Sequence, residues 1–136
     1  MADNNPSVFP MGEALTEQYS PYFTGLTFLQ PFGDKYGPIS NVTFSPGSHN
    51  DWHTHHASSG GGQVLFVTGG KGWLQILGEE ARPLLPGDVV EIPANVQHWH
   101  GAAKDSWFAH LSMEVVGEET YLEWNGPVNE DDYNKL

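Results

Sequence analysis

Short runs of apolar and β-branched residues, separated by Gly and Pro, follow one another along the chain from Gly25 onward. They recur at spacings of roughly ten residues, which is typical of an all-β sandwich or barrel. The pattern predicts eight strands, at 26–29, 40–45, 51–55, 63–68, 72–77, 88–92, 97–101 and 107–116. No internal repeat accompanies them, so we expect one barrel and not an array.

Two turns between these strands have a clear local signature. Gly69-Gly70 lies between two runs of β-forming residues and predicts a tight hairpin. In Pro86-Gly87-Asp88, proline fixes φ at the first corner and glycine accepts the positive φ of a type II turn.

The two ends of the chain are more polar than the middle. Residues 1–24 are broken by three prolines and predict an irregular N-terminal arm with at most a short helix near 13–19. The barrel is expected over 25–124. Residues 125–136 are expected to form an acidic C-terminal tail, in which Glu130–Tyr133 is either solvated or the start of a short helix.

Composition excludes several classes of function. A chain of 136 residues is the size of a single domain, and the absence of cysteine excludes disulfides, thiolate zinc sites and cysteine nucleophiles. A net charge of −12 opposes binding to nucleic acid or to an anionic membrane surface. No apolar run approaches the ~20 residues of a spanning helix. No secretory signal is visible, so a cytoplasmic location is expected.

Histidine is the residue type that points to chemistry. His53 and His55, like His98 and His100, are two positions apart, and in a strand such pairs share one face. Two pairs brought together by a β fold predict a cluster of neutral imidazoles, which suits a divalent transition metal. His49 and His56 are weaker candidates, because one lies in a predicted turn and the other has the opposite strand parity.

Gln63 follows a loop containing three consecutive glycines and begins a predicted strand. Its carbonyl oxygen is an acceptable ligand for a divalent ion. A glutamine that simply bonds to backbone at the start of a strand is an equal alternative at this point.

These residues resemble the two motifs of the cupin superfamily. The first runs from Gly47 through His53-Thr54-His55 to Gln63 and Gly70, and the second from Gly87-Asp88 to His98. The resemblance implies a cupin-type β-barrel, that is a double-stranded β-helix or jelly roll. It also implies one bound divalent metal with the ligands His53, His55, Gln63 and His98. The usual fourth ligand is Glu, and the gap before Gln63 is longer than usual.

Further residues resemble a narrower group of small bacterial single-domain cupins, often labelled carboxymuconolactone decarboxylase-like. They include Trp52-His53-Thr54-His55, His98-Trp99-His100-Gly101-Ala102 and His110-Leu111. Some members are manganese-dependent hydroxynitrile lyases. The resemblance implies that His100 and His110 are catalytic acid/base residues. Manganese or iron is the expected metal, with nickel, cobalt and zinc left open.

The strand at 107–116 alternates between a mixed face and an apolar face. Phe108, His110, Ser112 and Glu114 share the mixed face, so Glu114 joins the catalytic candidates by its position. If that face lines the barrel, the apolar face needs cover, which predicts a homodimer. We therefore expect a metal-dependent, lyase-type enzyme that acts on a small molecule. An iron-dependent dioxygenase and a non-catalytic ligand-binding cupin are the alternatives.

Overall fold

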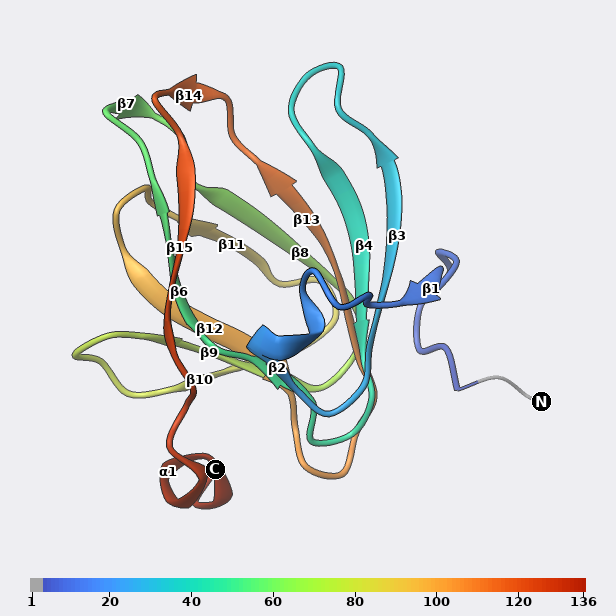
Figure 1. Ribbon diagram of the computed structural model, residues 1–136. Helices are drawn as coiled ribbons and strands as arrows, with labels where there is room; N and C mark the ends of the chain where they lie inside the picture. Colours follow the sequence, from blue (N-terminus) through green and yellow to red (C-terminus); the bar gives the residue numbers. More distant parts are fainter. Residues whose placement is uncertain (1–3) are drawn as a thin grey trace.

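The computed structural model describes residues 4–136, and two antiparallel sheets face each other across its interior (Figure 1). The first sheet contains, in spatial order, β1 (Glu13–Ala14), β3 (Thr27–Gly33), β4 (Ile39–Phe44), β13 (Phe108–Glu114), β8 (Gln63–Gly70) and β11 (Val89–Ile92). Five of the eight predicted strands meet in this sheet.

The second sheet contains, in spatial order, β10 (Arg82–Leu84), β9 (Gly72–Ile76), β12 (Gln97–Ala102), β5 (His49–Asn50) and β2 (Phe23–Thr24). In the same sheet, β6 (Trp52–His56) pairs with β12 on one side and β15 (Tyr121–Gly126) on the other. Two short strands, β7 (Ser59–Gly60) and β14 (Gly117–Glu118), pair separately. The all-β, jelly-roll architecture expected from the sequence is confirmed.

Period-2 alternation decides which side chains lie between the sheets. Along β8, Leu65 and Val67 are buried while Val64 and Phe66 are only half-buried. The apolar core gathers side chains from both sheets, namely Phe44, Leu65, Val67, Leu74, Leu84, Val90, Ile92, Ala102 and Phe108. Polar side chains, including His53, Gln63 and His98, are also buried.

The hairpin predicted at Gly69-Gly70 is wrong, because β8 and β9 belong to different sheets. The chain instead crosses from one sheet to the other here. Gly70 has a φ of +73°, and a Cβ at Gly69 would collide with the carbonyl group of Pro6. The glycines are therefore required by the crossing and by the close passage of the N-terminal arm. The turn at Pro86-Gly87 is as predicted, since Gly87 has a φ of +96° and Asp88 N donates to Leu85 O.

The short helix expected near 13–19 is also wrong. Glu13 and Ala14 form β1, which pairs with Leu29 and Phe28 of β3, and a single 3₁₀ turn, η1 (Ser20–Tyr22), follows later. Pairing with the edge of an existing sheet overrides the weak local preference for a helix.

The acidic end of the chain is folded onto the barrel. Asn129 caps helix α1 (Glu130–Asn134) by accepting a hydrogen bond from Asp132 N, and three acids occupy the first turn, where the helix dipole favours them. Tyr133 is buried and its hydroxyl donates to Ala102 O at 2.6 Å. Among residues 4–136 no helix has the length and apolar character needed to cross a membrane.

Candidate metal centre and active-site cavity

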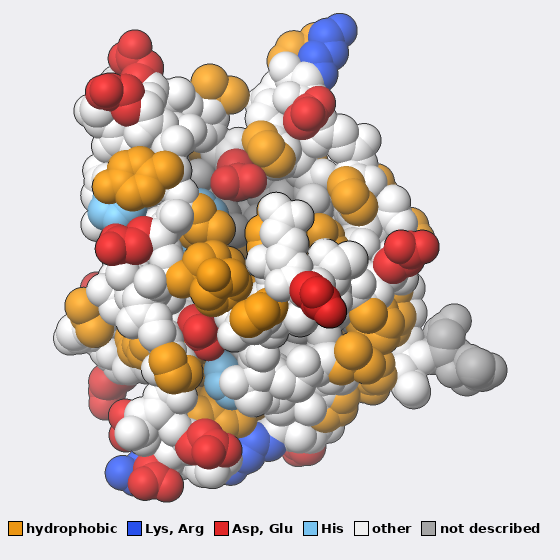
Figure 2. All heavy atoms as spheres, in the orientation of Figure 1, with side chains coloured by type: hydrophobic (Ala, Val, Ile, Leu, Met, Phe, Trp, Pro, Cys, Tyr) orange, Lys and Arg blue, Asp and Glu red, His pale blue; other side chains and the backbone are white. Residues whose placement is uncertain are grey.

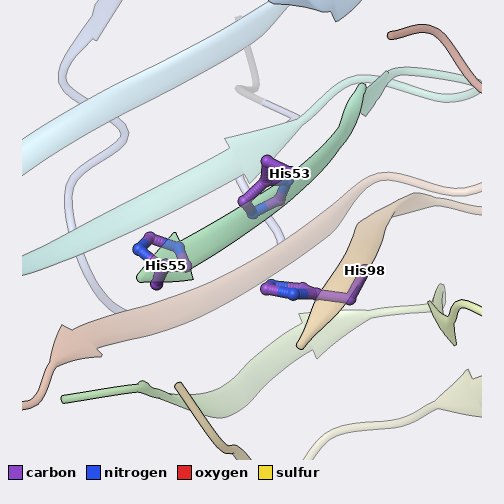
Figure 3. A group of neighbouring side chains, drawn as sticks. All are labelled: His53, His55 and His98. Atoms are coloured by element: carbon purple, nitrogen blue, oxygen red, sulfur yellow. The ribbon is translucent and has the colours of Figure 1, made fainter. Parts of the chain in front are cut away.

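Three histidines from two neighbouring strands converge at one point inside the barrel (Figure 3). His53 and His55 come from β6 and His98 from β12, and the strand register places His98 directly opposite His53. One ring nitrogen from each lies within 4.8 Å of the other two. The alternation of β6 thus provides the first two nitrogens, and its pairing with β12 provides the third.

Backbone carbonyl groups fix how two of these rings present their nitrogens. The Nδ1 atom of His53 lies 2.8 Å from Asp51 O, and Nδ1 of His98 lies 2.9 Å from Val96 O. Because a carbonyl only accepts, each Nδ1 carries the proton and each Nε2 keeps a lone pair. Burial lowers the pKa of His98 to about 4 and that of His53 well below its ordinary value. Both rings are therefore neutral at neutral pH.

His55 and Gln63 each add one further polar atom to this cluster. His55 Nε2 is buried and has no hydrogen-bond partner among the described residues. Gln63 Nε2 donates to Ser112 Oγ at 2.7 Å, which leaves Gln63 Oε1 facing His98 Nε2 at 3.3 Å. Several lone pairs directed at one buried point are unfavourable unless a cation neutralises them. Three imidazoles and an amide oxygen fit manganese, iron, cobalt, nickel or zinc.

A cavity of about 430 Å³ adjoins this cluster. Its apolar wall comes from three parts of the chain: the N-terminal segment, the first sheet and β15. These contribute Leu15, Tyr19, Phe23, Leu29, Val42, Leu122 and Trp124. No Lys or Arg is among the described residues that line it. In Figure 2, hydrophobic side chains gather on the face where β15 and the N-terminal segment lie side by side.

Two further histidines form a hydrogen-bonded pair beside the cluster. His100 lines the cavity, and its Nδ1 lies 3.0 Å from Nε2 of His110. His110 has no exposed surface and lies behind His100, against the rings of Phe44 and Phe108. Burial lowers the pKa of His110 to about 4 and holds that of His100 well below its ordinary value. Both rings are therefore neutral at neutral pH.

Asn50, which no sequence pattern singled out, holds His100 in place. Its Oδ1 accepts the backbone N–H of His100 at 2.9 Å. Its Nδ2 lies 3.3 and 3.5 Å from the two ring nitrogens of His100.

Glu114 lies at the boundary of the site. Its side chain is about half exposed, and Oε1 is 3.6 Å from Nδ1 of His55. It lines the main cavity and also a second one of about 490 Å³ that includes Lys35, His56 and Tyr121. Glu114 therefore connects the histidine cluster with the molecular surface.

The other two histidines lie away from the cluster. His49 stacks on Tyr133 with a centroid separation of 4.3 Å, and His56 pairs with Glu123 at 2.7 Å on the surface. The structure thus brings together His53, His55, Gln63 and His98, places His100 and Glu114 on the same cavity, and sets His110 behind His100. Their functional roles stay predictions. Ser112 was recognisable from the sequence only by sharing a strand face with His110 and Glu114.

Comparison with known proteins shows the family to which the chain belongs. Residues 40–113 match the model of the cupin domain family. The chain is 34% identical over 118 residues to an (R)-mandelonitrile lyase from Granulicella tundricola, a match that covers 84% of this chain and 87% of that protein.

Solved structures show the same fold. A cupin-like protein from Thermotoga maritima is 38% identical, with a TM-score of 0.84 over 95% of this chain and 96% of the other. A predicted oxalate decarboxylase from the same organism is 15% identical, with a TM-score of 0.66 over 76% and 90% of the two chains. The narrower carboxymuconolactone decarboxylase-like grouping stays a prediction. From its family match, its relatives and its fold, the chain belongs to the cupin family.

Proposed function

We propose that this chain is a metal-dependent lyase that cleaves a carbon–carbon bond next to a hydroxyl group in a small neutral molecule, with cyanohydrins as the first substrates to test. The observation that carries the proposal is the position of a neutral histidine pair beside a metal-type donor set in one apolar cavity. The 34% identity to an (R)-mandelonitrile lyase supports the choice of cyanohydrins.

His53, His55, Gln63 and His98 are the proposed ligands, and a divalent cation held there would lower the pKa of a substrate hydroxyl group. His100 is the proposed base. Its Nδ1 lies 3.0 Å from His110 Nε2, so Nε2, which lies 3.3 Å from Asn50 Nδ2, is the ring nitrogen proposed to accept the hydroxyl proton in place of the Asn50 amide. For Nε2 to carry the lone pair, the His100 proton must sit on Nδ1 and be donated to Nε2 of His110.

Charge balance then defines the second half of the reaction. As the hydroxyl oxygen loses its proton and becomes a carbonyl oxygen, the carbon–cyanide bond breaks and its electron pair leaves with cyanide. Cyanide takes the proton back from His100, so the protein ends in its starting state and the products are an aldehyde and hydrogen cyanide. The oxidation state of no group changes, in contrast to the dioxygenase alternative.

The lining of the cavity provides no cationic side chain that would bind an anionic group away from the metal. No Lys or Arg lines the part of it that the structure describes, and Glu114 lies at its edge. A divalent cation held by three neutral imidazoles and an amide would be the source of positive charge there, and it would attract the oxygen that loses its proton. A neutral substrate needs no second positive group.

The test is cleavage of racemic mandelonitrile by protein purified without a chelating column, loaded with Mn²⁺ or Fe²⁺ and assayed under mildly acidic conditions, where the spontaneous reaction is slow. We expect benzaldehyde release above the buffer rate, loss of it in His98→Ala, and the same rate without oxygen. Release that stops without oxygen would favour an iron-dependent dioxygenase. Metal binding without product from any cyanohydrin would favour a ligand-binding cupin.

A further inference from the structure

We propose that Ser112 is a positioning residue of the metal centre, which acts by holding the Gln63 amide with its oxygen toward the histidine cluster. The inference rests on the proposed function in one respect: it takes His53, His55, Gln63 and His98 as the metal ligands. It assigns to Ser112 a role that neither the family match nor the relatives describe.

The two ends of an amide group differ in what they offer to a cation. The carbonyl oxygen has lone pairs for a cation, whereas the nitrogen carries two hydrogens and has no available lone pair. The two ends have nearly the same size, so packing alone does not choose between them. A cation attracts the oxygen and repels the N–H groups, so a glutamine ligand is held best when a hydrogen-bond partner satisfies its nitrogen on the side away from the metal.

Ser112 Oγ is that partner. Gln63 Nε2 donates to it at 2.7 Å, and the opposite end of the amide, Oε1, then lies 3.3 Å from His98 Nε2. Gln63 is buried, with 7% of its surface exposed, so its nitrogen cannot exchange this partner for bulk water. Rotating the amide by half a turn would direct two N–H groups at the point where the imidazole lone pairs converge.

The sheet supplies the rigidity that such a role needs. Gln63 opens β8 and pairs with Glu114 of β13, while Ser112 pairs with Leu65. Ser112 is thus a diagonal neighbour of Gln63 on the same sheet face, a spacing at which side chains still reach each other. Its hydroxyl is placed by the strand register and not by a loop.

A residue that acts by orienting the Gln63 amide has nothing to act on once that amide is removed. If Ser112 acts in this way, its importance must depend on the amide being present and should vanish in Gln63→Ala. A Glu at position 63 would not separate the two cases, because the serine hydroxyl can donate to a carboxylate oxygen as well as accept from an amide nitrogen. A serine that merely packs in the strand would matter equally with Gln or Ala at position 63.

Ser40 offers a matched control. It stands directly opposite Ser112 on β4 and lines the same cavity. It is half-buried like Ser112, but its side chain makes no hydrogen bond within the part of the chain that the structure describes.

The experiment is the affinity for Mn²⁺, measured by equilibrium dialysis and elemental analysis, which needs no turnover. Ser112→Ala is expected to bind Mn²⁺ roughly tenfold more weakly, as is common when the partner of a ligand is removed. Ser112→Thr keeps the hydroxyl and is expected to restore most of the affinity, and Ser40→Ala is expected to match the wild type.

The decisive comparison is made in the Gln63→Ala background, in which the histidine ligands His53, His55 and His98 remain. There Ser112→Ala is expected to change the Mn²⁺ affinity by less than about twofold, so that the two substitutions are coupled. An unchanged affinity in Ser112→Ala, or the same loss in both backgrounds, would overturn the role of Ser112. Failure of the metal centre itself would be seen separately, as a wild-type chain that binds no Mn²⁺.

Discussion

Replacing His110 by Phe removes one buried group whose protonation opposes folding in acid. His110 is fully buried, and burial lowers its pKa from 6.5 to about 4. Above pH 6.5 the ring is neutral in both the folded and unfolded chain. Between pH 6.5 and 4 the unfolded chain binds a proton that the folded chain does not, so stability falls as the pH falls. Below pH 4 the loss is complete.

The size of the effect follows from that difference in pKa. Each unit corresponds to about 1.4 kcal/mol, so His110 alone accounts for a loss of about 3 kcal/mol across this interval. This is a large part of the 5–15 kcal/mol that stabilises an ordinary domain. His110 also lowers the pKa of His100 through charge repulsion, so removing it reduces the contribution of His100 in the same direction.

The assay is urea unfolding of the metal-free protein, followed by tryptophan fluorescence at a series of pH values. What is compared is the slope of unfolding free energy against pH, because His110→Phe also changes packing between Phe44 and Phe108 by an amount that does not depend on pH. We expect a clearly flatter slope between about pH 6.5 and 4.5.

Val42→Ala is the control for packing. Val42 stands opposite His110 in the strand register, is half-buried against the core and does not titrate. It should lower stability by the same amount at every pH. If His110→Phe retained the wild-type slope, the acid sensitivity would arise elsewhere, and the contribution assigned to His110 would be wrong.

Other features of the molecule lead to predictions of their own. Tyr133→Phe removes the hydrogen bond to Ala102 O and should lower the free energy of unfolding in urea by about 1 kcal/mol. Tyr19→Ala removes part of the apolar wall and so enlarges the cavity. The ratio of kcat/KM for a naphthyl cyanohydrin over that for a phenyl cyanohydrin should then rise about tenfold. A homodimer is expected through the outer face of the first sheet, where Val89 and Phe32 are exposed. Light scattering should then show a dimer for the wild type and a monomer for Val89→Glu.

Strand positions were predictable from the sequence where one face of the strand is buried. β8 alternates between buried and half-buried residues and lies where the pattern predicted it. β13 also lies where it was predicted, although its first three residues are buried on both faces. β15 was missed because its side chains are exposed or only half-buried, which leaves no alternation to detect. The pairing at Gly69-Gly70 was misread because a local pattern cannot distinguish a hairpin from a crossing between sheets.

The site was predictable to the same extent. His53 and His55 share a face by local geometry, and that part of the cluster needs no tertiary information. Its meeting with His98 depends on the pairing of β6 with β12, which only the family motifs indicated in advance. The contact of Asn50 with His100 joins residues 50 positions apart, and no local sequence pattern around either residue predicts it.

The pairing of β6 with β15 has a consequence for how the protein forms. β15 ends at Gly126, so the strand that carries His53 and His55 is still an unpaired edge when most of the chain has left the ribosome. Contacts so distant in sequence form slowly, because a long loop must close before they stabilise anything. The pairing of β6 with β15 is therefore expected to form late in folding, as is the equally long-range pairing of β4 with β13. A metal ion that reached the nascent chain before the pairing of β6 with β15 would meet imidazoles that are not yet held in the geometry of the complete site.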